Sequence, residues 1–305
     1  MTALARNQAR DKADSRLAQR PADAAAGRKL VNAMSVDVED YFQVQAFADK
    51  IERSDWDDLP CRVERNVDRL LEIFDEAGVK ATFFTLGWIA QRYPALVRRI
   101  VAAGHELASH GWDHTRADSQ DADHFRADVR KTKNFLEDVG SVPVIGYRAA
   151  TFSIGPSNYW AFDILEEEGY RYSSSLYPVR HDLYGDTGAS RVPFHPHDLP
   201  LLEVPMTTVQ WFGRNFPCSG GGYFRLLPYA VSRFNMRRVN RHDGQHCVFY
   251  FHPWEIDPDQ PRQGHIDVKT RLRHYTNLGL MEGRLKRLLK DFAWSRMDRV
   301  FLGSA

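Results

Sequence analysis

The sequence has little cysteine. Its three cysteines, Cys61, Cys218 and Cys247, are odd in number and form no close pair. This excludes the disulfide framework of a small secreted domain and fits a reducing compartment better. No apolar run approaches the roughly 18 residues of a membrane helix, so no membrane span is expected. A strong charge of one sign is also lacking, because the net charge is +1, and this suggests neither a nucleic-acid partner nor an anionic membrane.

Several motifs of common enzyme classes are absent as well. There is no Gly-x-Gly-x-x-Gly, no phosphate-binding loop and no Gly-x-Ser-x-Gly. Residues 1–29 hold seven Lys/Arg against three Asp and no apolar core. They therefore do not read as a secretory signal, and we expect a disordered N-terminal tail. Without a signal or a membrane helix, a cytoplasmic location is expected.

Segments with helical and strand periodicity alternate along the rest of the chain. The pattern predicts helices over 61–78, 89–104, 121–140 and 158–169, and strands over 79–87, 105–111, 142–149 and 170–176. Such alternation indicates βαβ units and a parallel sheet. We expect an α/β fold, a closed or nearly closed (β/α) barrel first and a doubly wound open sheet second. The predicted main domain spans residues 30–255, and residues 256–305 are expected to be a helical extension packed on the barrel.

Three carboxylates lie at the end of an apolar run that begins at residue 31 and should be a buried strand. They are Asp37, Glu39 and Asp40, and carboxylates at the end of a buried strand are costly unless something needs them. In a strand, Glu39 points to the same side as Asp37. If the strand has already turned, Asp40 instead of Glu39 lies on the side of Asp37.

Further polar residues follow other predicted strands. His110 and His114 lie in "SHGWDH", Arg148 lies in "GYRAATFS" at the end of the strand predicted over 142–149, and His252 follows the apolar run "CVFYF". In either architecture the carboxyl ends of the strands meet at one face, where active sites lie. A histidine pair alone is a moderate signal for zinc or another divalent ion. Together with the carboxylates it indicates a metal-dependent site.

These motifs, in this order, resemble the polysaccharide deacetylases of the NodB-homology family. "SVDVED", "SHGWDH", "RAAT" and "YFH" match the family's successive motifs. The later segments "GGGYFRLLPY" and "FYFHPWEID" look like the branch associated with bacterial exopolysaccharide loci. The resemblance implies a distorted (β/α) barrel and a hydrolase that removes N-acetyl groups from amino sugars of a polysaccharide. The implied substrate is an N-acetylated polysaccharide or a lipid-linked oligosaccharide.

The resemblance also implies a cofactor, one divalent metal ion, with zinc expected. His110 and His114 would bind it together with one carboxylate, Glu39 as first choice and Asp40 as the alternative. The metal would polarise the acetyl carbonyl and lower the pKa of bound water.

The remaining catalytic roles follow from the same resemblance. Asp37 would act as general base, held by Arg148, and His252 would protonate the leaving amine. The backbone N–H near Thr151 would help to stabilise the oxyanion. Family members often carry an aspartate in a fourth motif that orients the acidic histidine. The matching "YRYSSS" has no carboxylate, so the partner of His252 stays unidentified.

Residues 211–229, "WFGRNFPCSGGGYFRLLPY", are predicted to form a substrate loop near the metal. The glycine run would allow close approach to a ligand, while Trp211, Tyr223 and Arg225, with Trp254 further on, offer flat apolar faces and a hydrogen-bond donor to a sugar. A crossover loop with buried aromatics is the competing interpretation.

Two other functions stay open. The same scaffold could be a catalytically silent glycan-binding module, although none of the proposed catalytic residues is lost. It could also hydrolyse a small cyclic amide such as a ureide, and the intact histidine pair argues against this. The oligomeric state is not predicted.

Overall fold

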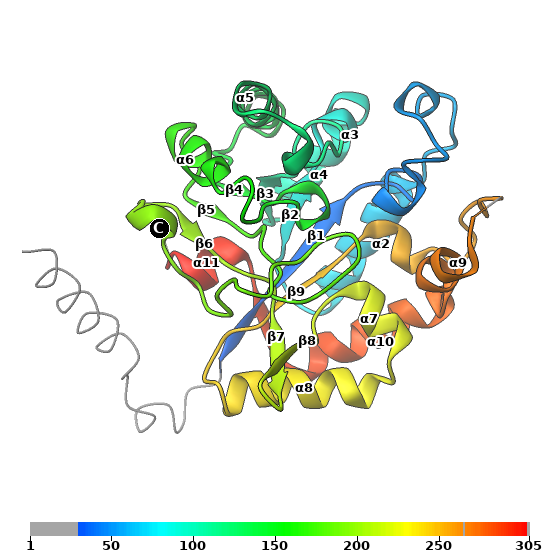
Figure 1. Ribbon diagram of the computed structural model, residues 1–305. Coiled ribbons are helices and arrows are strands. Elements are labelled where there is room, and N and C mark those ends of the chain that lie inside the picture. Colours follow the sequence, from blue (N-terminus) through cyan, green and yellow to red (C-terminus); the bar gives the residue numbers. More distant parts are fainter. Residues whose placement is uncertain (1–29, 265, 304–305) are drawn as a thin grey trace, which may run out of the picture. The chain divides into compact units, whose positions relative to one another are not determined.

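The computed structural model describes residues 30–264 and 266–303. The expected disordered tail, residues 1–29, lies outside this range. Within the described residues, a parallel sheet lies at the centre and helices cover it (Figure 1). Its strands are β1 Val31–Val38, β2 Thr82–Thr85, β3 Glu106–Ser109, β4 Gly146–Tyr147, β5 Tyr172–Ser173, β6 Leu202–Glu203, β9 Val248–Phe251 and β10 Ala293–Ser295.

The strand order confirms the predicted barrel-like fold. Strands β1 to β6 follow one another in the sheet, and β10 and β9 both pair with β1, the first along its start and the second along its later residues. Every one of these pairings is parallel. The sheet curls into part of a barrel, and the carboxyl ends of its strands therefore converge at one face.

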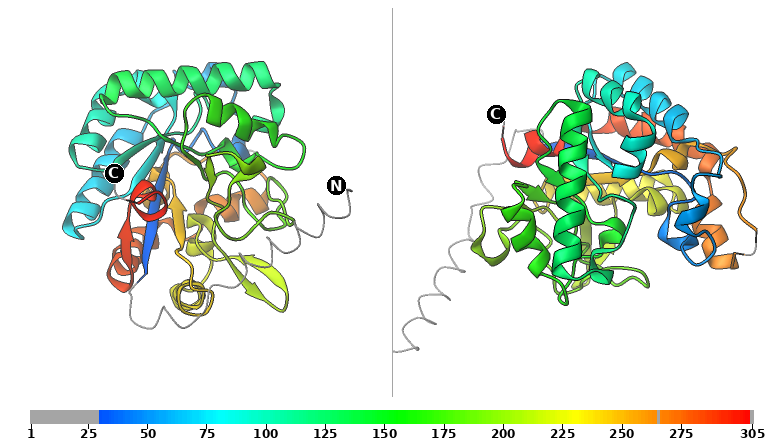
Figure 2. Two further views of the ribbon diagram at one scale, coloured as in Figure 1. Left: turned by 90° about the vertical axis from the view of Figure 1, so that its left-hand side faces the viewer. Right: turned by 90° about the horizontal axis from the view of Figure 1, so that it is seen from above.

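Helices pack on the outside of this sheet. In Figure 1, α3, α5 and α6 lie above the strands and α8 and α10 below them, and Figure 2 shows the long α5 running across the domain. The helices are α2 Val63–Glu76, α3 Gly87–Arg92, α4 Pro94–Ala102, α5 Ala122–Gly140, α6 Trp160–Glu167, α7 Gly221–Leu226, α8 Tyr229–Arg241, α9 Val268–Tyr275, α10 Leu278–Asp291 and α11 Met297–Phe301. None of the described helices is both long and apolar enough to cross a membrane.

The sequence pattern explains these elements well in the first half of the chain. In α2, Val63, Val67, Leu70 and Phe74 recur at helical spacing and are fully buried in the core between sheet and helices. The single helix predicted over 89–104 is instead two, α3 and α4. Pro94 stands at the first position of α4, where its fixed φ suits a new helix and its missing N–H costs nothing.

The second half departs from the predictions in two ways. The predicted helical extension, residues 256–305, contains α9, α10 and α11 but also β10, which pairs with β1 and so belongs to the central sheet. Residues 211–229 are not one loop. They hold the end of an antiparallel hairpin, β7 Thr208–Trp211 with β8 Arg214–Pro217, and then α7.

Candidate active site

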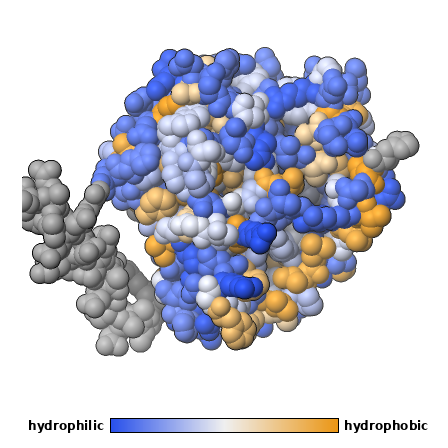
Figure 3. Space-filling view, viewed as in Figure 1, coloured by the Kyte–Doolittle hydropathy of each residue, from blue (hydrophilic) through white to orange (hydrophobic). Residues whose placement is uncertain are grey.

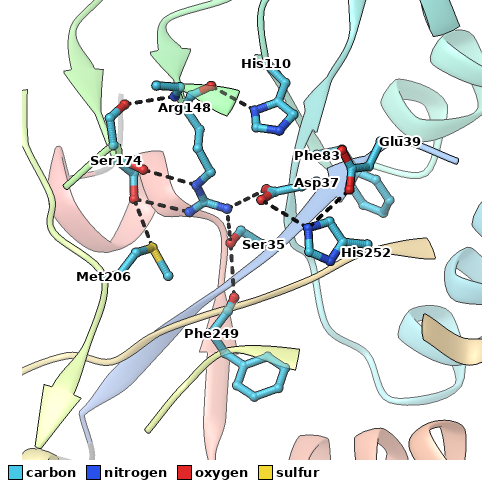
Figure 4. A network of polar contacts seen from close by, with 12 residues as sticks. Ser35, Asp37, Glu39, Phe83, His110, Arg148, Ser174, Met206, Phe249 and His252 are labelled. Carbon is cyan, nitrogen blue, oxygen red and sulfur yellow. Dashed lines mark hydrogen bonds and ion pairs between the residues drawn. The ribbon is translucent and has the colours of Figure 1, made fainter. Parts of the chain in front are cut away.

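The polar residues predicted at the strand ends do converge. Asp37 is the last residue but one of β1, His110 follows β3, Arg148 follows β4 and His252 follows β9. Figure 4 shows their side chains pointing toward one another. All but His252 are almost completely buried. Ionisable groups are rarely buried together without a partner or a ligand, so this cluster is a candidate active site.

Three of the residues predicted from the sequence form a candidate metal site. Glu39, His110 and His114 each offer a ligand atom, and the three atoms lie within 4.8 Å of one another. The Nε2 of His114 lies 3.0 Å from the Oε2 of Glu39, yet this buried oxygen accepts no well-aligned hydrogen bond. One carboxylate and two imidazoles are ligands typical of a catalytic zinc site. The residues present therefore fit a divalent cation.

The backbone and neighbouring groups fix both histidines. The Nδ1 of His110 lies 2.8 Å from the carbonyl oxygen of Arg148. A proton on Nδ1 would be donated to this carbonyl, which leaves Nε2 free as a ligand. His114 lies in a loop and has a left-handed φ of 60°, and the Asp128 carboxylate holds that loop through the N–H of Trp112 at 2.9 Å.

Electrostatics differ among the candidate ligands. Burial would raise the pKa of Glu39, but the imidazoles of His114 and His252 outweigh it and lower this pKa to about 2. Burial lowers the pKa of His110 to about 4. Glu39 is therefore a carboxylate and His110 a neutral imidazole at neutral pH, the forms that bind metals.

Asp40 was the alternative ligand, and this prediction is wrong. The chain turns after β1, and the Asp40 carboxylate accepts hydrogen bonds from the backbone N–H of Val63, at 2.9 Å, and of Tyr41, at 2.8 Å. It thus binds the start of α2, where N–H groups lack helical partners. Burial raises the pKa of Asp40 to about 6, against the effect of these hydrogen bonds.

Asp37 and Arg148 make the predicted contact. The Nη1 of Arg148 donates to the Oδ1 of Asp37 at 2.6 Å and to the Oγ of Ser35 at 2.9 Å. The Nη2 and Nε atoms donate to the hydroxyl and carbonyl of Ser174. The buried guanidinium also lies 4.0 Å from the ring centroid of Phe84. These contacts hold Arg148 in one position and therefore fix the orientation of Asp37.

His252 has a partner that the sequence interpretation missed. Its Nδ1 lies 2.9 Å from the Oε1 of Glu255, three residues further on. Its Nε2 lies 4.0 Å from the Oδ2 of Asp37 and 3.5 Å from the Oε1 of Glu39. Burial opposes a charged imidazole, but the carboxylates of Glu39, Glu255 and Asp37 outweigh it and raise the pKa of His252 to about 9. His252 is thus a protonated donor beside the candidate metal site.

Arg225 supports Glu255, and it also lines the cavity described below, so its substrate-binding role stays a prediction. Its Nε donates to the Oε2 of Glu255 at 2.7 Å, and its other nitrogens donate to the backbone carbonyls of Arg273, His274 and Thr276. The predicted glycine run likewise serves the protein itself. A Cβ at Gly221 would lie 2.2 Å from the Glu255 carboxylate, so only glycine lets this carboxylate approach α7.

The predicted aromatic residues separate into two groups. Trp254 is buried, stacks between the rings of His252 and His274 at 5.2 and 4.2 Å, and lies with its Nε1 3.4 Å from Glu39. Trp211 is at the hairpin and stacks on Phe234 of α8, so its prediction as a substrate-binding residue is wrong. It does not line the cavity described next.

A cavity of about 820 Å³ opens beside the cluster. Asp37, Glu39, His110, His114 and His252 line its inner end. The predicted Thr151, Tyr223, Arg225 and Trp254 also line it, together with Tyr184 and residues of α9. Thr151 has a left-handed φ of 56°, which is rare for a β-branched residue and costs free energy. The volume is that of a small-molecule or oligosaccharide site.

Comparison with known proteins finds two family models that each match part of the chain. Residues 53–172 match the family model described as polysaccharide deacetylase, and residues 174–302 match a domain of unknown function, DUF3473. The first match contains His110, His114 and Arg148, the second contains His252, and Asp37 and Glu39 precede both. The part of the chain that holds His110, His114 and Arg148 is thus similar to polysaccharide deacetylases, the family that the motifs resemble.

Curated relatives resemble part of the chain. A peptidoglycan deacetylase-like protein of Gibberella zeae is 30% identical over 112 residues, which cover 36% of this chain and 32% of the relative. The peptidoglycan deacetylase of Helicobacter pylori is 26% identical over 118 residues, 37% of this chain and 38% of the relative. The chain thus spans well under half of the length of these relatives.

Solved structures resemble nearly all of it in fold. A putative polysaccharide deacetylase from Mycobacterium smegmatis has a TM-score of 0.60 at 21% identity and covers 92% of each chain. An enzyme described as Puue allantoinase has a TM-score of 0.58 at 15% identity, with 94% of this chain and 96% of that chain covered. At these identities the likeness concerns the fold alone.

Proposed function

We propose that this protein is a metal-dependent hydrolase that removes N-acetyl groups from the amino sugars of a polysaccharide. The observation that carries this proposal is the placement of the Asp37 carboxylate and the His252 imidazole beside three candidate metal ligands. The family match supports the same class of reaction. A cavity of about 820 Å³ gives a sugar access to these groups.

The chain's own groups are arranged for the hydrolysis of an amide. Asp37 is oriented by Arg148 at 2.6 Å. It would take a proton from a water molecule as the oxygen of that water bonds to the acetyl carbon. His252, held through Nδ1 by Glu255 at 2.9 Å, would donate a proton from Nε2 to the amine as the C–N bond breaks. The products are acetate and a free amino sugar, and each proton has a donor and an acceptor.

One divalent metal ion, with zinc as the first choice, would be held by Glu39, His110 and His114. When bound, it supplies Lewis-acid polarisation of the acetyl carbonyl and a lowered pKa for water. The chain's contribution is to keep the two imidazoles neutral and oriented, with the His110 ring fixed by the Arg148 carbonyl.

The rival functions remain testable alternatives. A silent glycan-binding module would not need a base and an acid beside three buried ligands. A cyclic-amide hydrolase is compatible with the fold, since the allantoinase structure is similar. The candidate metal ligands Glu39, His110 and His114 favour the deacetylase, because cyclic-amide hydrolases of this fold often dispense with a metal.

The substrate class can be tested directly. Acetate release should be measured with N-acetylglucosamine and N-acetylgalactosamine oligomers of several lengths, and ring opening with allantoin as the matched competitor. We expect acetate from at least one oligomer and no ring opening. Ring opening without acetate release would assign the protein to the cyclic-amide hydrolases, and binding of oligomers without either product would make it a binding module.

The narrower assignments belong to the same proposal. The segments "GGGYFRLLPY" and "FYFHPWEID" resemble the branch of exopolysaccharide loci, which supports a bacterial exopolysaccharide or its lipid-linked precursor as substrate. A cytoplasmic site of action is proposed with it.

A further inference from the structure

The hairpin of β7 and β8 carries an exposed aromatic residue at its tip. Trp211 pairs with Arg214 across the two strands, so Phe212 and Gly213 form a two-residue turn. The Phe212 side chain is 99% exposed. Nothing in the described part of the chain covers it, and this apolar side chain gains no burial from folding.

Phe212 is also a poor choice for the turn. Its φ is 51° and that of Gly213 is 74°, so both central residues are left-handed. Turns of this type favour Asn-Gly, because a bulky side chain at positive φ is strained. A phenylalanine here is unfavourable for local structure and contributes nothing to the core, which points to a role outside the folded domain.

The surface around the tip combines apolar and basic residues. Phe216 on β8 and Phe234 and Val231 on α8 are exposed, the phenylalanines by 45% and 59%. We call Phe212, Phe216, Val231 and Phe234 the hairpin patch. Figure 3 shows hydrophobic and strongly hydrophilic surface alternating over the lower part of this view, where Figure 1 places the hairpin and α8.

Arginines border the hairpin patch. Arg233 and Arg237 are paired with Asp291, and Arg238 lies over the ring of Trp211 at 4.3 Å. Arg214, which pairs with Trp211 across the hairpin, is exposed, and no salt bridge is found for it within residues 30–264 and 266–303. The patch thus carries positive charge that folding does not neutralise, although the net charge of the whole chain is only +1.

We propose that the hairpin patch docks on an anionic lipid surface, with Phe212 inserted among the headgroups. Aromatic side chains flanked by basic ones are typical of segments that lie in the membrane interface. A protein partner would favour aromatic anchors inside a broad, well-packed area, whereas here the most exposed anchor projects alone from a two-residue turn. The proposal is independent of the proposed catalytic function.

Vesicle sedimentation tests this proposal with the whole chain. We expect it to sediment with phosphatidylcholine vesicles that contain phosphatidylglycerol, weakly with phosphatidylcholine alone, and less as salt rises. Phe212→Asn should weaken binding about 10-fold or more, the loss expected for one buried aromatic side chain. This change creates the favoured Asn-Gly turn, so the thermal midpoint should stay the same or rise.

Two further variants give controls. Arg214→Gln should weaken binding to the anionic vesicles and reduce its salt dependence. Val268→Asn replaces another exposed apolar residue, 72% exposed at the start of α9, and should leave binding unchanged. Absence of vesicle binding, or equal binding by Phe212→Asn and the wild type, would overturn the proposal. A dimer in sedimentation velocity that Phe212→Asn dissociates would instead assign the patch to a second copy of the chain.

Discussion

The strand-end residues were predicted to form the metal and catalytic site, and the segment 211–229 was predicted to bind substrate. The structure brings the first group together but divides the second. At the strand ends, Asp37, Glu39, His110 and His252 lie together and line one cavity. In the segment, Tyr223 lines that cavity, Trp211 packs on α8 and Arg225 holds Glu255. The first prediction rested on topology, which brings strand ends together. The second rested on residue types, which suit a binding loop and a core equally.

The largest effect on activity is expected from a change at the proposed general base, Asp37. Asp37→Asn should lower kcat for acetate release by roughly 10²- to 10⁴-fold, because positioned proton transfer is lost. Its amide oxygen can still accept from Arg148, so metal content should stay as in the wild type. Kinetics and metal analysis on the same preparation check this. Loss of metal with Asp37→Asn, and its retention in Glu39→Ala, would show that the two roles are inverted.

A buried carboxyl on β6, outside the strand-end site, predicts a pH dependence of stability. Glu203 accepts from the backbone N–H groups of Ser175 and Leu176, and burial raises its pKa from 4.5 to about 7. The folded state therefore binds more protons than the unfolded state between these values, and stability falls as pH rises through this window.

Glu203→Gln should reduce this slope by the contribution of Glu203, which amounts to at most ~3 kcal/mol for a shift of this size, while the buried Asp40 keeps its own contribution. Urea unfolding at several pH values between about 5 and 8 would measure it. The exposed Glu72→Gln is the control and should keep the wild-type slope. An unchanged slope in Glu203→Gln would mean that Glu203 is ionised throughout.

A smaller loss of activity is expected when the residues that orient His252 are changed. Glu255→Gln keeps the side-chain size but removes the charge that His252 and Arg225 share, and we expect kcat to fall roughly 10- to 100-fold with little change in KM. Arg225→Lys should act in the same direction, since a single ammonium cannot replace the forked contacts. If kcat in both variants matches the wild type while the thermal midpoint falls, Glu255 serves the fold alone.

The smallest expected effects separate the two halves of segment 211–229. Tyr223→Ala should raise KM for an oligomer by roughly 3- to 10-fold, as expected for one lost aromatic contact, at nearly constant thermal midpoint. Trp211→Ala should lower the midpoint, because its stacking on Phe234 is lost, and leave KM unchanged. The reverse pattern would return Trp211 to the binding site and remove Tyr223 from it.

Sequence periodicity was sufficient for the first half of the fold. Apolar spacing in α2 and the strand-helix alternation predicted the barrel-like sheet, and the side-chain period of a strand put Glu39 on the side of Asp37. Asp40 could not be resolved in this way, because its role depends on where the chain turns toward α2. The prediction of a single helix at 89–104 was wrong because Pro94 starts a second helix inside the apolar periodicity. The prediction of a loop at 211–229 was wrong because the two-residue turn at Phe212 and Gly213 joins two short strands, which the residue types do not indicate.

The partner of His252 was missed for a different reason. It was sought in the motif that other family members use, whereas Glu255 lies three residues after His252 in "HPWE". The spacing was visible in the sequence, but nothing there showed that Arg225, 30 residues earlier, holds the other carboxylate oxygen. Contacts between distant segments of this kind need the folded structure.

Restoring metal to chelator-treated protein tests the central claim most directly. Acetate release from an N-acetylhexosamine oligomer should vanish after chelation and return on addition of one equivalent of a divalent ion. It should stay absent in His110→Ala plus His114→Ala under the same addition. Acetate release that survives chelation, or that returns in the double variant, would contradict the assignment of Glu39, His110 and His114 as the centre of the site.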